Sequence, residues 1–281
     1  MGDGLMTMLR LLVPADAAVL HAFLLPRATS SMFLLSNSRM AGLVDEGKPY
    51  QATYVGAFDG GELVGVAAHC WNGMVLVQAA LDRVRELASC AVANSGRAIA
   101  GFSGAADQVA IARGAFELPA AAVDEVESLY SLELADLIVP AALGECRRPI
   151  ATELTRLAEW RRAYHLESLG ASDADDVADK AAREIDQLFA LSRLWVLDVG
   201  GVLVAMTGFN AQIPGVAQVG GVFTPRELRG RGYARRVVAG SLLDSRGEID
   251  RAILFTPNPS AARAYEAIGF RRIGDYALVM L

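Results

Sequence analysis

Residues 219–234 read Val-Gly-Gly-Val-Phe-Thr-Pro-Arg-Glu-Leu-Arg-Gly-Arg-Gly-Tyr-Ala, an apolar run followed by a turn with two separated glycines. The apolar run predicts a strand that ends near Pro225, and the apolar residues after Gly232 predict a helix. A glycine turn at the start of a helix leaves backbone N–H groups free, and the helix dipole favours negative charge there. The stretch therefore predicts a phosphate-binding loop between a strand and a helix.

The glycines and arginines of this turn narrow the choice of ligand. Gly230 and Gly232 have no Cβ to keep a ligand from the backbone, and Arg229 adds positive charge. For an isolated glycine pair the alternative is a plain turn with solvated arginines. A dinucleotide-binding fingerprint does not fit, because its third small residue would fall on Arg235. The pattern Gln/Arg-x-x-Gly-x-Gly/Ala fits, since Arg229, Gly232 and Ala234 fill its fixed positions.

A second motif lies downstream in residues 256–270, which read Thr-Pro-Asn-Pro-Ser-Ala-Ala-Arg-Ala-Tyr-Glu-Ala-Ile-Gly-Phe. It matches Asn-x-x-Ala-x-x-x-Tyr-x-x-x-Gly-Phe, with Asn258 and Tyr265 at the polar positions. In this order the two motifs resemble those of the GNAT superfamily of acyl-CoA-dependent N-acetyltransferases. The resemblance covers residues 217–281, and the hairpin and helices back to Glu145 fit the rest of such a domain.

The resemblance implies a role for each motif residue. The residues whose backbone amides would hold the coenzyme's pyrophosphate are Arg229, Gly230, Arg231, Gly232, Tyr233 and Ala234. The strand end would pair with the pantetheine amides through Val222, Phe223 and Thr224. Asn258 would bind the pantetheine arm at the start of a helix that continues with Ser260 and Ala261. Tyr265 would give a proton to the departing thiolate. Taken alone, Asn258 could be a helix cap and Tyr265 a packing residue.

The sequence does not single out a general base. Some family members carry a Glu on the strand that leads to the loop, but the corresponding residue here is Gln218, which cannot take a proton. The base is elsewhere or unnecessary. Glu167 is the catalytic candidate, with His165 beside it, on a predicted helix where Trp160 and Tyr164 share a face with Glu167. The alternative is a solvated Glu over packed aromatic residues. Two further residues that could contact substrate or lie in a loop are Asn210 and Gln212.

Two hairpins with glycine turns mark an order of elements that repeats along the chain. Gly60-Gly61 joins two apolar runs in the first half, and Gly200-Gly201 joins two in the second. The sequence therefore predicts an α+β fold of two GNAT-like domains, residues 1–144 and 145–281, each a mostly antiparallel twisted sheet flanked by helices. Other expected elements are helices over 152–169 and 173–191 and a strand over 134–139.

The first half repeats the elements but not the loop. After Gln78 the chain passes through two alanines into Leu81 without a glycine, so the free amides of a phosphate cradle are missing. We therefore expect a degenerate domain that helps to shape the acceptor pocket. The expected stoichiometry is one coenzyme per chain.

Composition limits the other function classes. The 281-residue chain has a formal net charge of −6, which argues against a nucleic-acid partner. Its three cysteines lack the spacing of metal ligands, so we expect no metal and reduced thiols in the cytoplasm. The apolar stretch from Leu9 to Leu25 is interrupted by Arg10, Asp16 and His21, so we expect neither a signal peptide nor a membrane partner.

The expected activity is transfer of an acetyl group from acetyl-CoA, as acyl donor, to a primary amine by direct attack. The acceptor is a small-molecule or peptide amine, because the motifs specify the donor and not the acceptor. The alternative is a non-catalytic acyl-CoA-binding or sensing module. The sequence leaves the oligomeric state open.

Overall fold

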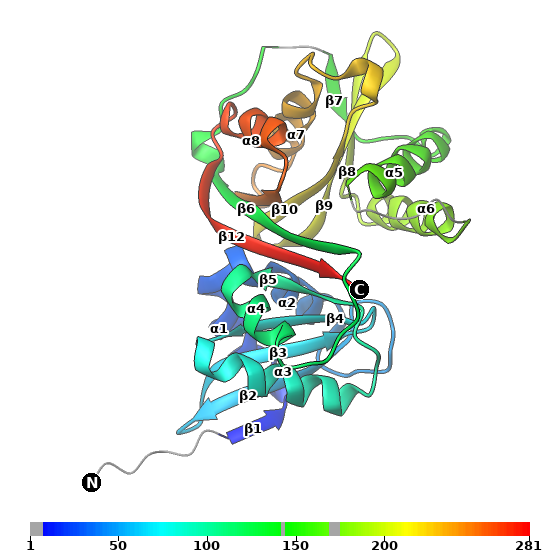
Figure 1. Ribbon diagram of the computed structural model, residues 1–281. Helices are drawn as coiled ribbons and strands as arrows, with labels where there is room; N and C mark the ends of the chain where they lie inside the picture. The colour runs from blue at the N-terminus through cyan, green and yellow to red at the C-terminus, as the bar shows by residue number, and fades with distance from the viewer. Residues whose placement is uncertain (1–7, 142–143, 169–174) are drawn as a thin grey trace. The chain divides into compact units, whose positions relative to one another are not determined.

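The computed structural model describes residues 8–141, 144–168 and 175–281. The chain divides into two compact units (Figure 1). The N unit comprises Met1–Ser128 and Gly274–Leu281, and the C unit comprises Leu129–Ile273. Each unit contains a twisted, mostly antiparallel sheet flanked by helices. This is the predicted α+β fold class.

The N unit begins with strand β1 at the edge of its sheet, and the sheet order is β1-β2-β3-β4-β5-β12. The first five strands of this sheet, in chain order, are β1 (Met8–Leu11), β2 (Ala52–Asp59), β3 (Glu62–Cys70), β4 (Met74–Ala79) and β5 (Gly101–Ala105). The helices are α1 (Ala17–Leu24), α2 (Ala28–Ala41), α3 (Leu81–Ser95) and α4 (Ala106–Arg113). The apolar faces of α3 and α4 pack with Val55, Val75 and Phe102 in one core.

The C unit carries its helices on both faces of the sheet β6-β11-β10-β9-β8-β7 (Figure 1). Its strands are β6 (Val123–Glu133, from Leu129 on), β7 (Glu145–Arg147), β8 (Leu194–Val199), β9 (Val202–Ile213), β10 (Gly215–Phe223) and β11 (Ile249–Thr256). Its helices are α5 (Leu154–Ser168), α6 (Asp175–Ala190), α7 (Tyr233–Asp244) and α8 (Pro259–Glu266). Leu157 and Ile185 of α5 and α6 pack on one face, and Val237 and Leu242 of α7 on the other.

Both predicted hairpins are confirmed. β2 and β3 pair through Asp59↔Glu62, and β8 and β9 pair through Val199↔Val202. The two residues between them are glycines with positive φ in each case, 58° and 90° at Gly60 and Gly61 and 62° and 84° at Gly200 and Gly201. Glycine adopts this pair of conformations without strain, so the turns fix the register of both hairpins.

Each unit also contains one pair of parallel strands that pair with each other along only part of their length. β4 and β5 pair at Met74↔Gly101 and Val75↔Phe102. β10 and β11 pair from Gly215↔Ile249 as far as Gln218↔Ile253. Beyond these residues the strands of each pair separate, which creates the place where a side chain or a ligand can enter between them.

The boundaries between the two compact units do not fall between residues 144 and 145, where the sequence analysis expects the domains to meet. The last strand, β12 (Arg271–Met280), pairs with β5 from Tyr276↔Ala105 to Met280↔Gly101, so the C-terminus completes the N unit. The strand expected over residues 134–139 is wrong. β6 ends at Glu133, and Leu134–Asp136 form a 3-10 turn that buries Leu134. The charged residues of β6 hide its alternation of buried and exposed positions.

The helical segment Pro14–Ala41 is long and apolar enough to cross a membrane by length and composition. It consists of short 3-10 turns together with α1 and α2, and the backbone departs from helical angles at Ser31. Leu20 and Leu35 within it are fully buried in the protein. A core helix of a soluble domain passes the same test, so the segment is weak evidence for a membrane span.

Candidate active site

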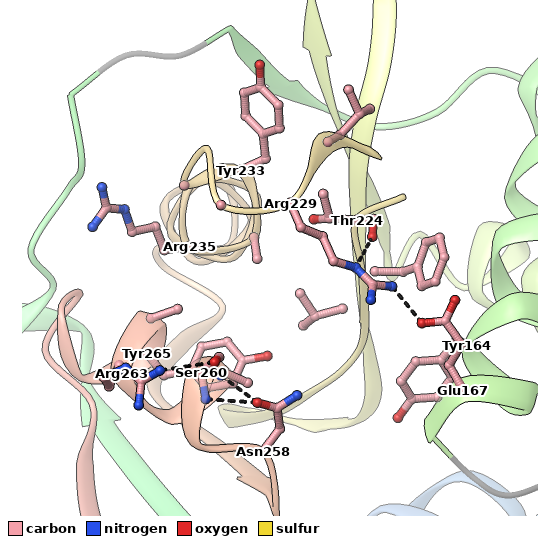
Figure 2. Close-up of a pocket in the computed structure, with 18 residues that line it drawn as sticks. Tyr164, Glu167, Thr224, Arg229, Tyr233, Arg235, Asn258, Ser260, Arg263 and Tyr265 are labelled. Carbon is pink, nitrogen blue, oxygen red and sulfur yellow. Dashed lines mark hydrogen bonds and ion pairs between the residues drawn. The ribbon is translucent and has the colours of Figure 1, made fainter. Parts of the chain in front are cut away.

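A cleft of about 640 Å³ lies in the C unit, between the end of β10, the loop before α7, the start of α8 and the last turns of α5 (Figure 2). It gathers every predicted coenzyme-binding or catalytic residue except Arg231. These are Glu167, Val222, Phe223, Thr224, Arg229, Gly230, Gly232, Tyr233, Ala234, Asn258, Ser260, Ala261 and Tyr265. Arg231 is exposed and donates a hydrogen bond to the Glu227 carbonyl at 3.4 Å. Segments far apart in the sequence thus form one cleft.

The glycine loop presents unpaired backbone donors to the cleft. Among the described residues, none accepts a hydrogen bond from the backbone N–H groups of residues 230–235. Gly232 is the N-cap of α7 with φ 81°, and Gly230 has φ 78°. A Cβ on Gly232 would lie 3.1 Å from Arg235 Nε, whereas one on Gly230 would meet nothing within 4 Å. The loop is an anion cradle at the start of a helix, as the sequence predicts.

The end of β10 offers a second row of backbone groups. Pairing with β11 stops at Gln218↔Ile253, and pairing with β9 is irregular between Gly220 and Phe223. Val222, Phe223 and Thr224 line the cleft beyond this point. An extended ligand with amide groups can therefore add to the free edge as a strand does.

Asn258 caps α8 and lines the cleft. Its Oδ1 accepts hydrogen bonds from Ser260 N at 2.8 Å and from Ala261 N at 3.3 Å. The helix-cap interpretation is therefore confirmed for this side-chain oxygen. No described residue accepts from its Nδ2, so the amide donors are available to a ligand.

Tyr265 lies on α8, on the wall of the cleft that also holds Asn258, while Tyr164 and Glu167 of α5 lie across from it (Figure 2). Tyr265 is only 7% exposed, and burial raises the pKa of its phenol, with a further contribution from Tyr164. The phenol is therefore protonated throughout the neutral range and is a hydrogen-bond donor. Phe270 supports its ring in an edge contact with centroids 6.0 Å apart.

Glu167 is bound to two arginines. Its carboxylate accepts from Arg226 Nε at 3.0 Å and from Arg229 Nη2 at 2.7 Å, and Arg229 Nε also donates to the Thr224 carbonyl (Figure 2). Burial alone would raise the pKa of Glu167, but the hydrogen bonds from Arg229 and Arg226 outweigh it and lower the pKa. A carboxylate held in this way is a weak base. Its observed contacts are those of a residue that orients the loop.

His165 does not line the cleft among the described residues. It is 3% exposed, and its Nε2 lies 2.8 Å from Glu184 Oε2 of α6. Arg161 Nε donates to the same oxygen at 2.6 Å. Burial would raise the pKa of Glu184, but His165 and Arg161 outweigh it and lower the pKa to about 2. His165 thus belongs to a buried ionic network beneath the cleft.

The polar residues on β9 and β10 have separate positions. The Asn210 side chain lies against Gly220, where any Cβ would collide with it. Gln212 donates to Glu248 Oε2 at 3.0 Å on the surface. Gln218 is 1% exposed and donates to the Val219 carbonyl at 2.7 Å, while its Oε1 has no partner among the described residues. Gln218 therefore acts as a buried polar group and not as a base.

The sequence analysis missed several residues of the cleft and its support. Arg263 lines the cleft and donates to Ser260 Oγ at 3.0 Å, and Arg235 lines it from the first turn of α7. Arg161 is a charged residue one helical turn from the buried Leu157 on α5. A charge on the apolar face of a helix is the sequence signal that could have revealed it. Its partner Glu184 lies on another helix, and no local pattern joins the two.

The cationic groups at the cleft outnumber the anionic ones. Arg229, Arg235 and Arg263 line it, and Glu167 is the only carboxylate among its lining residues that the structure describes. The resulting positive potential attracts an anionic ligand in a chain whose net charge is negative. In the described part of the chain, no group of three or more His, Cys, Asp or Glu side chains is placed to hold a metal ion.

Comparisons with known proteins agree with this geometry. Residues 154–270 match the model of the acetyltransferase (GNAT) family. A GNAT-family acetyltransferase from Colwellia psychrerythraea superposes with a TM-score of 0.59 at 14% identity and covers 98% of this chain and 100% of its own. A GCN5-related N-acetyltransferase from Sphaerobacter thermophilus has a TM-score of 0.59 at 16% identity, covering 97% and 94% of the two chains.

A tandem GNAT protein from the clavulanic acid biosynthesis pathway has a TM-score of 0.55 at 12% identity and covers 98% of both chains. These similarities extend over the whole fold, including the N unit. No curated protein matches the sequence.

Proposed function

We propose, from the premise that residues 154–270 form a GNAT acetyltransferase domain, that the C unit binds acetyl-CoA and transfers its acetyl group to a primary amine. One observation carries the proposal. The free edge of β10, the unpaired amides of the glycine loop and the phenol of Tyr265 face a single cleft. This arrangement joins an anion site to a site for an extended amide-bearing arm and ends at a proton donor.

The residues of the cleft fit the parts of acetyl-CoA. The N–H groups of residues 230–235 suit its diphosphate, since they meet no other acceptor among the described residues. The edge of β10 at Val222 and Phe223 suits the pantetheine amides, and the Asn258 Nδ2 donors suit a carbonyl of the same arm. When bound, acetyl-CoA supplies the thioester whose acetyl group is transferred.

Tyr265 is the proton donor of the proposed reaction. The transfer joins the amine nitrogen to the acetyl carbon, breaks the bond from that carbon to sulfur and leaves a thiolate that needs a proton. Because burial keeps the phenol of Tyr265 protonated, it can donate to the sulfur. Tyr164 on the opposite wall lies close enough to affect the titration of Tyr265, so the two rings bound the reacting end of the cleft.

The acceptor reacts as the neutral amine. Among the described lining residues Glu167 is the only carboxylate, and none is a histidine. Because two arginines hold Glu167, we assign it to orienting Arg229 and not to removing a proton. The amine therefore loses its first proton to water before it enters, and the pH dependence of the reaction follows the pKa of the acceptor.

Calorimetric titration with acetyl-CoA tests the first half of the proposal. We expect one site per chain, and we expect Gly232→Trp to abolish it because a bulky side chain at positive φ distorts the cradle. Arg229→Glu should weaken binding strongly through charge reversal. Undiminished binding by Gly232→Trp would contradict the assignment of the loop.

Thiol release with a panel of amines tests the second half. An acetyltransferase releases one thiol for each amine acetylated. A non-catalytic binding module consumes the thioester only by slow hydrolysis. Binding of acetyl-CoA without amine-dependent thiol release would therefore overturn the proposed reaction and leave the binding site.

A further inference from the structure

Arg161 of α5 is a nearly buried arginine whose two terminal nitrogens, Nη1 and Nη2, have no acceptor among the described residues. The residue is 9% exposed. Its Nε donates to Glu184 Oε2 at 2.6 Å, and no residue in the described ranges accepts a hydrogen bond from Nη1 or Nη2. Neither Nη atom is among the fully buried side-chain atoms that lack a partner, so both remain accessible to a small ligand. The two Nη groups are therefore positioned to bind a further group.

These nitrogens lie next to the reacting end of the cleft. The Arg161 guanidinium lies over the Tyr164 ring, 5.1 Å from its centroid, and Tyr164 lines the cleft. Nη1 lies against Gly221, where any Cβ would collide with it, and Gly221 directly precedes the cleft residue Val222. The φ of 59° at Gly221 is the left-handed conformation that favours glycine, so the bend of β10 makes room for the guanidinium.

Two further polar side chains lie on β9 and β10 close to this bend in the sequence or in space. Asn210 of β9 lies against Gly220, the residue next to Gly221. Gln218 of β10 is 1% exposed; its Nε2 donates to the Val219 carbonyl, and its Oε1 has no partner among the residues described. Packing of α5 on β10 does not by itself require so many polar groups, which are the donors of Arg161 and Asn210 and the acceptor of Gln218.

We infer that Arg161 binds a carboxylate of the acceptor, so that the substrate class is an amine that also carries a carboxyl group. The inference rests on the proposed acetyl transfer. Nε of Arg161 already donates to Glu184, so the two Nη groups remain as a pair of donors at the end of the guanidinium. The geometry of this pair matches the two oxygens of a carboxylate. Glu184, which also contacts His165, holds the guanidinium through Nε, so the Nη pair is oriented before a substrate enters.

Kinetics with matched acceptors test the inference. The probes are ω-amino acids from glycine to 6-aminohexanoate, each paired with its carboxamide, together with carboxylate-free alkylamines, at saturating acetyl-CoA. We expect the carboxylate member to exceed its carboxamide in kcat/KM by about tenfold to a hundredfold for at least one chain length, as for a hydrogen bond to a charged group. The series of lengths measures the distance from the amine to Arg161.

Variants assign the preference to Arg161. Arg161→Lys keeps a positive charge beside Glu184 but loses the planar pair of donors, so the carboxylate preference should fall at least tenfold through KM. In the double variant Arg161→Gln/Glu184→Gln no buried charge stays unpaired, and the preference should disappear. Arg156→Gln removes an exposed arginine from the same helix and should retain it. Unchanged affinity for acetyl-CoA shows that each variant is folded.

Four results would overturn the inference. Equal turnover of carboxylates and carboxamides by the wild type would show that no carboxylate site exists. A preference that survives Arg161→Lys and the double variant would place the site elsewhere. Transfer to carboxylate-free amines alone would exclude this substrate class and leave the proposed function standing. Absence of transfer to every amine would overturn the proposed function itself, and with it the inference.

Discussion

The two units of this protein contain the same kind of parallel strand pair and use it in opposite ways. In the C unit, β10 ends at Phe223 and α7 begins at Tyr233, and the loop between them leaves its amides free. In the N unit, β4 ends at Ala79 and α3 begins at Leu81, so the chain has no room for a loop. The difference is therefore in the connection and not in the sheet.

The N unit fills its strand gap with its own side chains. Gln108 of α4 accepts a hydrogen bond from Ala79 N at 2.9 Å, and Gln78 accepts from Ser30 and Ser31 at 2.8 and 2.6 Å. The N-cap of α4 is Ala105, which makes no side-chain cap, where Asn258 caps α8 in the C unit. Groups that a ligand would satisfy in the C unit are satisfied internally in the N unit.

The contrast gives a physical reason why the same fold keeps a cleft open in one unit and closes the strand gap in the other. A gap between diverging strands exposes backbone groups, and these must bind either a ligand or the protein itself. Short connections and glutamine side chains close the gap, whereas a glycine loop keeps it open. The following predictions test this account by comparing matched residues of the two units.

The largest expected effect is a change in kcat that distinguishes two buried tyrosines, one in each unit. Tyr265 of the C unit lines the cleft, whereas Tyr276 in the N unit accepts a hydrogen bond from Ser103 Oγ at 3.1 Å. Tyr265→Phe should lower kcat about a hundredfold, the usual contribution of a positioned acid, with little change in acetyl-CoA affinity. Steady-state kinetics and calorimetry measure the two quantities.

Tyr276→Phe is the control because it removes a hydroxyl of similar burial outside the cleft. It should leave kcat unchanged and affect stability only. An unchanged kcat in Tyr265→Phe would remove Tyr265 from the mechanism.

The next prediction compares two buried carboxylates. Glu184 in the C unit is paired, and its pKa is lowered to about 2. Glu127 in the N unit is 7% exposed, its Oε2 has no partner among the described residues, and burial with the charge of Glu125 raises its pKa to about 7. The folded protein thus binds a proton at Glu127 that the unfolded chain has released, so stability falls as pH rises from about 4.5 to 7.

Glu127→Gln should remove this loss and stabilise the N unit by about 2–3 kcal/mol at pH 8, with little effect at pH 4.5. The pH dependence of stability that comes from paired Glu184 has the opposite sign. Its stabilising contribution is present above about pH 4.5 and is lost as the pH falls towards 2. Urea denaturation at several pH values measures the stability, and hydrogen exchange in β2 and β8 assigns each change to a unit. Glu86→Gln, an exposed substitution on α3, is the control.

Sequence patterns predicted the parts of this comparison that depend on neighbours in the chain. The glycine hairpins, the loop at Gly232 and the cap at Asn258 each follow from a few adjacent residues, and the structure contains them. The pairing of Arg161 with Glu184 joins two helices, and the bond from Ala79 to Gln108 joins a strand to a distant helix. Such contacts depend on packing between segments, which no local period encodes.

The course of the last strand illustrates the same limit. β12 becomes apolar from Tyr276 on, and nothing in its sequence shows that it pairs with β5 of the N unit. The boundary expected at residue 144 assumed that each half of the chain closes its own sheet. Strand pairing across the sequence is set by the tertiary fold, so the compact units differ from the halves of the chain.

The smallest expected effect concerns an ion pair near the first turn of the corresponding helix in each unit. In the C unit Glu167 binds Arg229 before α7, and in the N unit Asp59 binds Arg83 of α3 at 2.8 Å. Glu167→Gln removes a negative charge that competes with phosphate for Arg229, so acetyl-CoA should bind about two- to fivefold more tightly at low salt, the scale of an exposed ion pair.

The same substitution distinguishes the two roles of Glu167. If it only orients Arg229, kcat stays within about twofold while the affinity for acetyl-CoA changes. If it is the general base, kcat falls about a hundredfold or more, since the amide cannot take a proton. Asp59→Asn should change neither quantity, because a single residue, Ala80, separates β4 from α3 and offers no glycine loop to an anion there. A drop in kcat for Glu167→Gln alone would therefore show that the C unit differs from the N unit in a proton acceptor as well as in its loop.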